Sequence, residues 1–247
     1  LIKEEKMMQI ILDASRYDYY VDEYRNIIKG DLEPVYSSGR NTYEYTKNTY
    51  DRDHTDMLYV SGALPINPVY TEENAPELYK EKYLPKEHLR IEDVCNKAWD
   101  PELGTVPPEE VTKATQKNKE EKMVAHYFQP HSPFIGNYNL LEHVEYPPER
   151  EAGGDEPIWN RFHRKEIEEE DIRRAYRSNL RRALNEAKKL AEKFDDRRIV
   201  ITSDHGELFG EGGLYGHPPR QHPNLRKLPW LEVEDTIDNP KYEKLKE

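Results

Sequence analysis

Short runs of apolar residues divide the chain into alternating strands and helices. Four such runs predict buried strands, at Met7–Leu12, Met57–Val60, Met123–Phe128 and Ile199–Thr202. Between the third and the fourth run, residues 167–194 carry apolar side chains at three- and four-residue spacing, which predicts an amphipathic helix. Strands that alternate with helices predict an α/β fold with a mainly parallel central sheet and helices on both of its faces.

Two polar stretches interrupt this alternation. Residues 68–121 are rich in Glu, Lys, Pro and Tyr, and we expect a long polar excursion that caps the sheet edge or the site. Residues 145–166 contain paired prolines and paired glycines, which indicate a loop. The tail after Val233 is predicted to be peripheral. We therefore expect a single α/β domain over residues 1–247, with one excursion at about 68–121.

The composition limits the possible partners. Hydrophobic and charged residues each make up 35% of the chain, so we expect a modest core and much solvated surface. The net charge of −12 argues against binding to a nucleic-acid backbone, although a local basic cluster could still hold a small anion. Cys95 is the single cysteine, which excludes a disulfide framework. No apolar run approaches the ~18 residues of a membrane span, so no span is expected and a cytoplasmic location is predicted.

Candidate metal ligands stand at the ends of two predicted strands. Asp13 ends the first strand, and Asp204 and His205 follow the fourth. If these strands are neighbours in a parallel sheet, two carboxylates and one imidazole converge, as a divalent cation such as Mn²⁺, Mg²⁺ or Zn²⁺ requires. Two plainer interpretations remain open at this point: Asp13 as a helix cap, and the stretch SDHGE as a structural turn.

A third candidate segment spans residues 35–50. It supplies the hydroxyls of Ser38 and Thr42 and the guanidinium of Arg40 just before a predicted helix. A hydroxyl bound to a metal loses its proton more readily and becomes a nucleophile near neutral pH. The alternative is that these residues only cap the helix, which Ser, Thr and Asn commonly do.

Histidines are concentrated in a few short segments. His126 and His131 flank a turn in AHYFQPHSPF, and His217 and His222 follow the SDHGE stretch. With His205, these make five of the nine histidines in the chain. One histidine on a strand is commonly a core residue, but this clustering favours a site.

The motifs resemble the alkaline phosphatase superfamily, in its sulfatase-like branch. The resemblance rests on IILDASRYD, on AHYFQPHSPF, and on VITSDHGELFGEGGLYGH followed by the strand LRKLPWLEV. It implies that Asp13, Asp204 and His205 bind a metal. It also implies a nucleophilic hydroxyl after the first helix that contacts the metal, for which Thr42 is the candidate and Ser38 the reserve.

The resemblance assigns further roles around the anion. It implies that His131 contacts the anionic group of the substrate and that His217 binds the same group or a second metal, while His126 is grouped with them. Arg40 is expected to help hold the anion. The sulfatases of this family carry Cys or Ser in a Cys-x-Pro-x-Arg pattern, which SSGRNT lacks, so phosphate esters are favoured over sulfate esters.

The resulting prediction is a metal-dependent hydrolase or transferase of phosphate or sulfate esters that forms a covalent intermediate. A single Mn, Mg, Zn or Ca ion is expected as the cofactor. The expected substrate is a small-molecule, carbohydrate or lipid-headgroup ester. The alternative is a catalytically inactive sulfatase-like domain that binds metal and serves as an interaction module, with which the 18 tyrosines are compatible.

Overall fold

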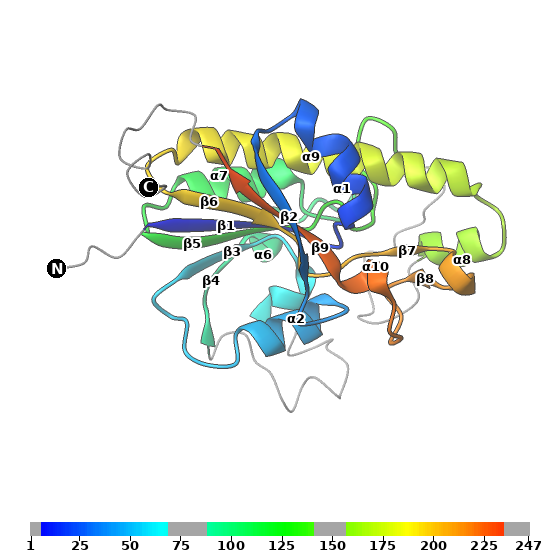
Figure 1. The fold of residues 1–247 in the computed structure, drawn as a ribbon, viewed down its shortest axis with the longest axis horizontal. Coiled ribbons are helices and arrows are strands. Elements are labelled where there is room, and N and C mark those ends of the chain that lie inside the picture. Colours follow the sequence, from blue (N-terminus) through cyan, green and yellow to red (C-terminus); the bar gives the residue numbers. More distant parts are fainter. Residues whose placement is uncertain (1–5, 69–87, 141–156, 235–247) are drawn as a thin grey trace.

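A seven-stranded sheet forms the centre of the structure (Figure 1). The computed structural model describes residues 6–68, 88–140 and 157–234. Across the sheet the strands follow the order β2, β9, β6, β1, β5, β3, β4. Their bounds are β1 Met7–Leu12, β2 Gly30–Tyr36, β3 Leu58–Ser61, β4 Arg90–Asp93, β5 Lys122–Tyr127, β6 Arg198–Thr202 and β9 Lys227–Val233. A separate hairpin pairs β7, Leu208–Phe209, with β8, Tyr215–Gly216.

Most of the sheet is parallel. The neighbouring strands β6, β1, β5, β3 and β4 run in one direction, whereas β9 is antiparallel to β6 and β2 is antiparallel to β9. The strand β1 lies in the middle, with Leu12 opposite Tyr127 of β5 and Ile11 opposite Thr202 of β6. The carboxyl ends of these three strands therefore meet at one edge of the sheet. This confirms the predicted mainly parallel α/β architecture.

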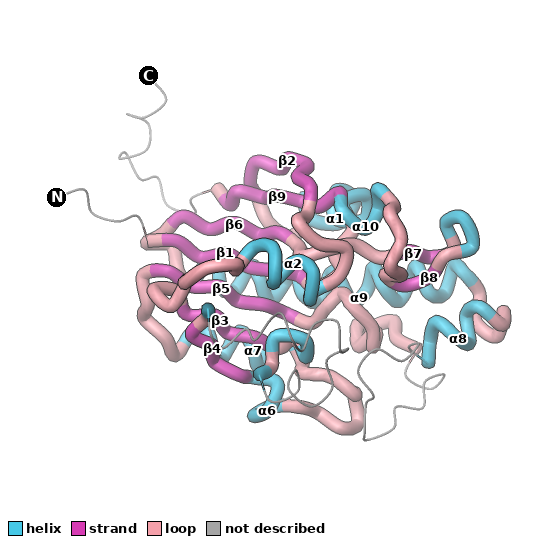
Figure 2. The backbone as a smooth tube through the Cα atoms, turned by 90° about the horizontal axis from the view of Figure 1, so that it is seen from below, coloured by secondary structure: helices cyan, strands magenta, loops and turns pink. Residues whose placement is uncertain are grey.

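Helices cover both faces of the sheet. Figure 2 shows α2 in front of the strands and α9 behind them, and in Figure 1 α7 lies on the same side as α9. Their bounds are α1 Tyr17–Glu23, α2 Thr42–Thr49, α6 Val94–Ala98, α7 Pro108–Gln116, α8 Pro157–His163, α9 Glu169–Lys193 and α10 Pro223–Arg226. The arrangement on both faces is the one that the sequence predicts.

The long helix α9 closes one side of the core. Its apolar face buries Leu180, Leu184 and Leu190 completely, and the helix contacts β1 and α7. Its other face carries charged side chains, for example Arg173, which pairs with Glu169 one turn earlier. The high charge content of the chain is thus placed partly on the solvated half of this helix. No helix within the described ranges combines the length and apolarity that crossing a bilayer requires.

The prediction of a polar excursion at residues 68–121 is wrong for residues 88–121. Residues 88–121 form β4, α6 and α7, and α7 packs against α9 and β5 with Val111 fully buried. The prediction fails here because β4 is a four-residue edge strand with the sequence RIED, and α7 is too short to show a sustained apolar period. Residues 69–87 lie outside the described residues.

Three other boundaries differ from the sequence prediction. The loop expected at 145–166 contains α8, whose Trp159 and Phe162 side chains are buried, while residues 145–156 lie outside the described residues. The first helix, which the amphipathic stretch through Ile27 and Ile28 predicts to extend that far, ends at Glu23 and continues as a 3-10 turn to Asn26. The strand β2 was not anticipated, because its charged and proline residues hide the strand pattern.

Candidate active site

Two buried carboxylates meet where β1 and β6 end. Asp13 directly follows β1, Asp204 follows β6 after Ser203, and both carboxylates are at most 1% exposed. The Ser203 hydroxyl joins the two loops by accepting a hydrogen bond from the Ser15 amide at 2.8 Å. The Ala14 amide donates to Asp204 Oδ1 at 3.2 Å. The structure thus brings together the two acidic residues that the sequence singled out.

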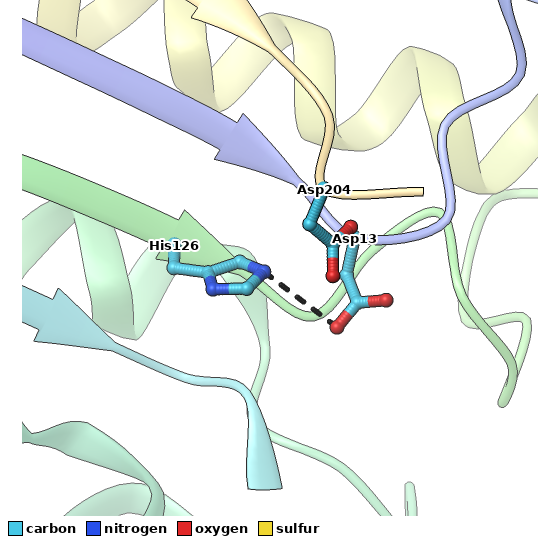
Figure 3. A group of neighbouring side chains, drawn as sticks. All are labelled: Asp13, His126 and Asp204. Carbon is cyan, nitrogen blue, oxygen red and sulfur yellow. Dashed lines mark ion pairs between the residues drawn. The ribbon is translucent and has the colours of Figure 1, made fainter. Parts of the chain in front are cut away.

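Asp13 does not cap the helix that follows it. The residue at the N-cap of α1 is Arg16, and its side chain makes no capping hydrogen bond. The Asp13 carboxylate is directed instead toward Asp204 and His126 (Figure 3), and it also lies close to His205. The capping interpretation that the sequence left open is therefore excluded by the geometry.

The imidazole of His126 adds a nitrogen to these carboxylates (Figure 3). His126 lies near the end of β5, is fully buried, and places Nε2 at 3.6 Å from Asp13 Oδ2. One ligand atom from each of Asp13, His126 and Asp204 lies within 4.8 Å of the other two. The opposite ring nitrogen, Nδ1, is 2.8 Å from the Tyr59 hydroxyl, which fixes the direction of Nε2. The sequence grouped His126 with the anion-binding histidines, whereas the structure places it with the carboxylates.

His205 faces the same point from the other side. Its Nε2 lies 3.3 Å from Asp13 Oδ1 and 3.5 Å from Asp204 Oδ2. Its Nδ1 lies 2.8 Å from the Gly206 carbonyl oxygen and donates to it, so Nε2 is the nitrogen available as a ligand. Asp13, His126, Asp204 and His205 are candidate ligands of one metal ion, and we call this group of four side chains the metal cluster.

Thr42 presents its hydroxyl to the metal cluster. Its Oγ1 lies 3.3 Å from His205 Nε2 and 3.4 Å from Asp13 Oδ2, and the side chain is buried. Thr42 is the first residue of α2, but the helix is capped by Asn41, whose side chain accepts from the Glu44 amide at 2.9 Å. Because Asn41 performs the capping, the Thr42 hydroxyl is directed to the cluster.

The electrostatics of the metal cluster are dominated by burial and by the close opposite charges. Burial lowers the pKa of His205, but the Asp204 and Asp13 carboxylates outweigh it and raise the pKa to about 9. Burial also lowers the pKa of His126, and there the carboxylates do not reverse the effect. The pKa of Asp204 is lowered overall, because the two imidazoles and Thr42 outweigh burial. Positive charge is thus needed between the carboxylates, and a proton on His205 or a divalent cation can supply it.

The donor atoms of the metal cluster fit a divalent cation. Asp13 Oδ1, Asp204 Oδ2 and His126 Nε2 are all buried without a hydrogen-bond partner. Buried polar atoms in this state are costly and require an explanation, and ligation of a cation provides one. Carboxylate oxygens combined with imidazole nitrogens suit Zn²⁺ or Mn²⁺ better than Ca²⁺ or Mg²⁺, which prefer oxygen alone.

Two further histidines lie between the metal cluster and the surface. His131 is buried and His217 is partly exposed, with 3.2 Å between their Nε2 atoms. The His217 ring is centred 4.7 Å from the ring of His205. The His131 amide donates to the Asp13 carbonyl oxygen at 3.1 Å, and the Asn179 side chain donates to the His131 carbonyl oxygen at 3.1 Å. These bonds hold the His131 backbone beside the loop that carries Asp13.

Comparison with known proteins places this geometry in a known fold. No protein-family model matches the chain, and no curated protein matches its sequence. Among solved structures, the soluble domain of lipooligosaccharide phosphoethanolamine transferase A from Neisseria meningitidis matches with a TM-score of 0.56 and 13% identity. The match covers 92% of this chain and 76% of that one. The chain has a sulfatase-like fold.

Two other solved structures share this sulfatase-like fold. The C-terminal periplasmic domain of EcEptC from Escherichia coli, in complex with Zn, has a TM-score of 0.53 and 10% identity, covering 94% of this chain and 73% of that one. A putative sulfatase from Bacteroides thetaiotaomicron has a TM-score of 0.54 and 12% identity, covering 95% of this chain and 65% of that one. The resemblance inferred from the sequence is thereby confirmed for the fold, and the activity is argued from the site.

Within the sulfatase-like fold, Ser38 and Arg40 lie away from the position of the Thr42 hydroxyl. The Ser38 hydroxyl is 2.8 Å from Thr49 Oγ1, at the end of α2. The Arg40 side chain donates from Nε to the Glu44 carboxylate at 2.9 Å. Both residues line a surface cavity beside α2. The structure therefore separates these two candidates from the metal cluster, whereas Thr42 joins it.

Gly206 has a structural role that the sequence only suggested. A Cβ atom added there would stand 1.9 Å from the Asn224 carbonyl oxygen, and the Gly206 amide donates to the Leu225 carbonyl oxygen at 2.9 Å. The loop that carries Asp204 and His205 thus rests directly on α10. The sequence indicated a sharp exit from the strand, but the requirement for glycine is close backbone contact. Tyr59 was missed altogether, because the sequence does not show that β3 neighbours β5.

Proposed function

We propose that this protein transfers the phosphoryl-containing group of a phosphate ester to water or to an alcohol, with Thr42 as the nucleophile. The observation that carries the proposal is the Thr42 hydroxyl, at 3.3 Å from His205 Nε2 and 3.4 Å from Asp13 Oδ2. The structural neighbours, which are described as phosphoethanolamine transferases and a putative sulfatase, support chemistry of this class.

The residues of the site have different roles in the proposed reaction. Asp13, His126, Asp204 and His205 would hold the cation, which when bound lowers the pKa of the Thr42 hydroxyl and offsets negative charge on the phosphate. Mixed oxygen and nitrogen donors favour Zn²⁺ or Mn²⁺. A Zn complex of the Escherichia coli structural neighbour supports this choice.

The covalent step exchanges one ester bond for another. The Thr42 hydroxyl gives up its proton to solvent, its oxygen attacks phosphorus, a new O–P bond forms, and the bond to the leaving alcohol breaks. The leaving oxygen carries away the electron pair and takes a proton from the imidazole pair His131 and His217, which are 3.2 Å apart at their Nε2 atoms. Water or an acceptor alcohol then attacks phosphorus, returns a proton to the imidazole pair, and the O–P bond to Thr42 breaks with its electron pair left on the Thr42 oxygen.

The anion is recognised by positive and hydrogen-bonding groups around the attack site. His131 and His217 would contact the non-bridging phosphate oxygens. Stabilising the negative charge on these oxygens contributes most to catalysis of phosphoryl transfer. Threonine cannot take the place of the Cys or Ser that sulfatases convert to formylglycine, which supports phosphate esters over sulfate esters. We propose a lipid-headgroup, carbohydrate or small-molecule phosphate ester as the substrate. The cytoplasmic location stays a prediction.

The test compares Thr42→Ala with wild-type protein on aryl phosphate, aryl phosphodiester and aryl sulfate substrates, each with added Zn²⁺ or Mn²⁺. We expect turnover of a phosphate ester by the wild type and a loss of at least about 1,000-fold in Thr42→Ala. Bound metal, measured by elemental analysis, should stay within about twofold, because four ligands remain. Mass spectrometry of a quenched reaction should show a phosphoryl adduct on the peptide that contains Thr42.

Ser38→Ala is the matched control, because Ser38 is the reserve nucleophile and its hydroxyl lies 2.8 Å from Thr49 Oγ1, about two turns along α2 from Thr42. Its activity should equal that of the wild type. If Thr42→Ala retains full activity while Ser38→Ala loses it, the nucleophile is misassigned. If wild-type protein binds metal but turns over none of the esters, the alternative of a metal-binding interaction module is favoured.

A further inference from the structure

A cavity of about 380 Å³ lies beside α2, apart from the metal cluster. It is bounded by the loop before α2, by the exposed side of the helix, and by two residues next to or within α10. Its lining residues are Ser38, Gly39, Arg40, Glu44, Lys47, Asn48, Gln221 and Arg226. We call this space the α2 cavity.

The α2 cavity and the Thr42 hydroxyl lie on opposite sides of one helix. Successive residues of an α-helix turn by about 100°, so Glu44 and Lys47 point about 140° to 160° away from Thr42. Thr42 is buried against His205, whereas Lys47 is exposed. A ligand in the α2 cavity is therefore not held by the metal cluster.

The α2 cavity is positively charged although the chain is acidic. Three cations, on Arg40, Lys47 and Arg226, face one carboxylate, on Glu44, which leaves a net charge of +2 in the lining of a chain whose net charge is −12. The Glu44 carboxylate is already engaged, because it accepts from the Arg40 amide at 3.0 Å and from Arg40 Nε at 2.9 Å. The excess charge of the lining is thus carried by Lys47 and Arg226.

These two cations differ in how they are held. Arg226 donates from Nε and Nη2 to the Ser37 carbonyl oxygen at 2.9 and 2.6 Å, which fixes the guanidinium plane without neutralising it. Lys47 forms no ion pair with any residue in the described ranges. Arginine and lysine side chains both bind phosphate groups, the first through a planar fork of donors and the second as a point charge. The Gln221 amide adds a neutral donor to the lining, while Asn48 Nδ2 donates to the Ser38 carbonyl oxygen at 2.8 Å.

We propose that the α2 cavity is a second anion site, which binds the phosphate or sulfate group of a small molecule through Arg226, Lys47 and Arg40. Ligand pockets span about 300 to 1,000 Å³. A volume of 380 Å³ therefore accommodates an anionic group with a small organic portion attached. The site does not depend on turnover at Thr42, so it stands whether or not the proposed reaction occurs.

The test measures binding of inorganic phosphate by isothermal titration calorimetry to the full chain after metal removal with EDTA. Lys47→Gln should bind phosphate about three- to fivefold more weakly than the wild type, as expected for one exposed charge. Adding Arg226→Gln should weaken binding more than about tenfold, because a charge-assisted hydrogen bond is lost. Lys117→Gln is the matched control, since Lys117 is an exposed lysine outside the cavity, and it should leave the affinity unchanged.

Two further arms fix the location and the source of the anion. In Thr42→Ala and in the double variant His131→Ala/His217→Ala, the phosphate binding that Lys47→Gln weakens should persist; its loss there would place the anion in the catalytic site and overturn the proposal. Equal affinity of Lys47→Gln and wild type would also overturn it, and this exposed variant is not expected to unfold.

Glucose 6-phosphate and phosphatidic acid vesicles distinguish a free phosphate ester from a lipid headgroup, with glucose and phosphatidylcholine vesicles as controls. The proposal is supported if the wild type binds either phosphate source and if Lys47→Gln weakens that binding. If the wild type binds neither source and no inorganic phosphate, the α2 cavity is not an anion site.

Discussion

Replacing Ser203 by alanine tests whether the metal cluster is held together by the serine between β6 and Asp204. The Ser203 hydroxyl accepts from the Ser15 amide at 2.8 Å and lies 2.7 Å from the Leu12 carbonyl oxygen and 2.6 Å from that of His205. It is the link between the loop that carries Asp13 and the loop that carries Asp204. Because these loops follow neighbouring strands, their spacing sets the spacing of the metal ligands.

The expected cost follows from the bonds that alanine removes. The hydroxyl has one proton and can donate to one of the two carbonyl oxygens at a time, so Ser203→Ala loses two hydrogen bonds. The Ser15 amide retains a 3.2 Å bond to the Leu12 carbonyl oxygen, which limits the loss. We expect the free energy of unfolding to fall by about 2 to 4 kcal/mol. For a chain of this size that lowers Tm by roughly 4 to 16 °C.

The assay is urea unfolding of metal-depleted protein, together with titration of Zn²⁺ into folded protein. Ser203→Ala should weaken Zn²⁺ binding about tenfold, as the loss of an outer-shell partner does. Ser178→Ala is the matched control: its buried hydroxyl on α9 accepts from the Tyr138 amide at 2.9 Å instead of linking the loops that carry the metal ligands. It should cost about 1 to 2 kcal/mol and leave the Zn²⁺ affinity unchanged.

Two results would refute this reasoning. If Ser203→Ala and Ser178→Ala cost the same and Ser203→Ala binds Zn²⁺ as tightly as the wild type, the Ser203 hydroxyl does not set the ligand spacing. If Ser178→Ala weakens Zn²⁺ binding to the same extent as Ser203→Ala, the effect is a general loss of stability and not a local one.

Metal removal and acid provide two further predictions. Excess Zn²⁺ or Mn²⁺ at 100 times its Kd should stabilise EDTA-treated protein by about 2.7 kcal/mol in scanning fluorimetry, and Asp204→Asn should remove that response. Burial raises the pKa of Glu211, but hydrogen bonds from Arg16 lower it overall from the ordinary value of 4.5. The ion pair of Arg16 and Glu211 therefore stabilises the fold above pH 4.5 and ceases to do so as the pH falls through the lower pKa of folded Glu211. In urea unfolding, Glu211→Gln should thus lose less stability than the wild type between about pH 6 and about pH 3. An equal loss in the two proteins contradicts the assignment.

The strands that the sequence predicted are the central strands of the sheet. In β1, β5 and β6 nearly every position is buried on one face or the other, so the sequence shows a continuous apolar run. The edge strands β2 and β4 have exposed and charged positions and leave no such run. Their pairing is decided by neighbours that are distant in the sequence, which a local pattern does not contain.

The candidate site was predictable to the extent that it depends on strand ends. Asp13, Asp204 and His205 follow two apolar runs, and the parallel sheet brings them together because β1 and β6 are neighbours. His126 joined the metal cluster for a reason that the sequence does not show, namely that β5 lies on the other side of β1. The prediction that Thr42 is the nucleophile depended on the resemblance to the family, because a hydroxyl at the start of a helix is otherwise an ordinary helix cap.

The loop before α2 shows why residues close in sequence can serve different sites. Gly39 packs so tightly on the helix that an added Cβ would lie 2.1 Å from the Tyr45 amide nitrogen. The loop therefore crosses the first turn of α2, and Arg40 reaches Glu44 on the side away from the metal cluster. One helix of eight residues thus presents the Thr42 hydroxyl to the metal cluster and the Lys47 ammonium to the α2 cavity. Substitutions at Thr42 and at Lys47 should accordingly act on separate properties, ester turnover in the first case and anion affinity in the second.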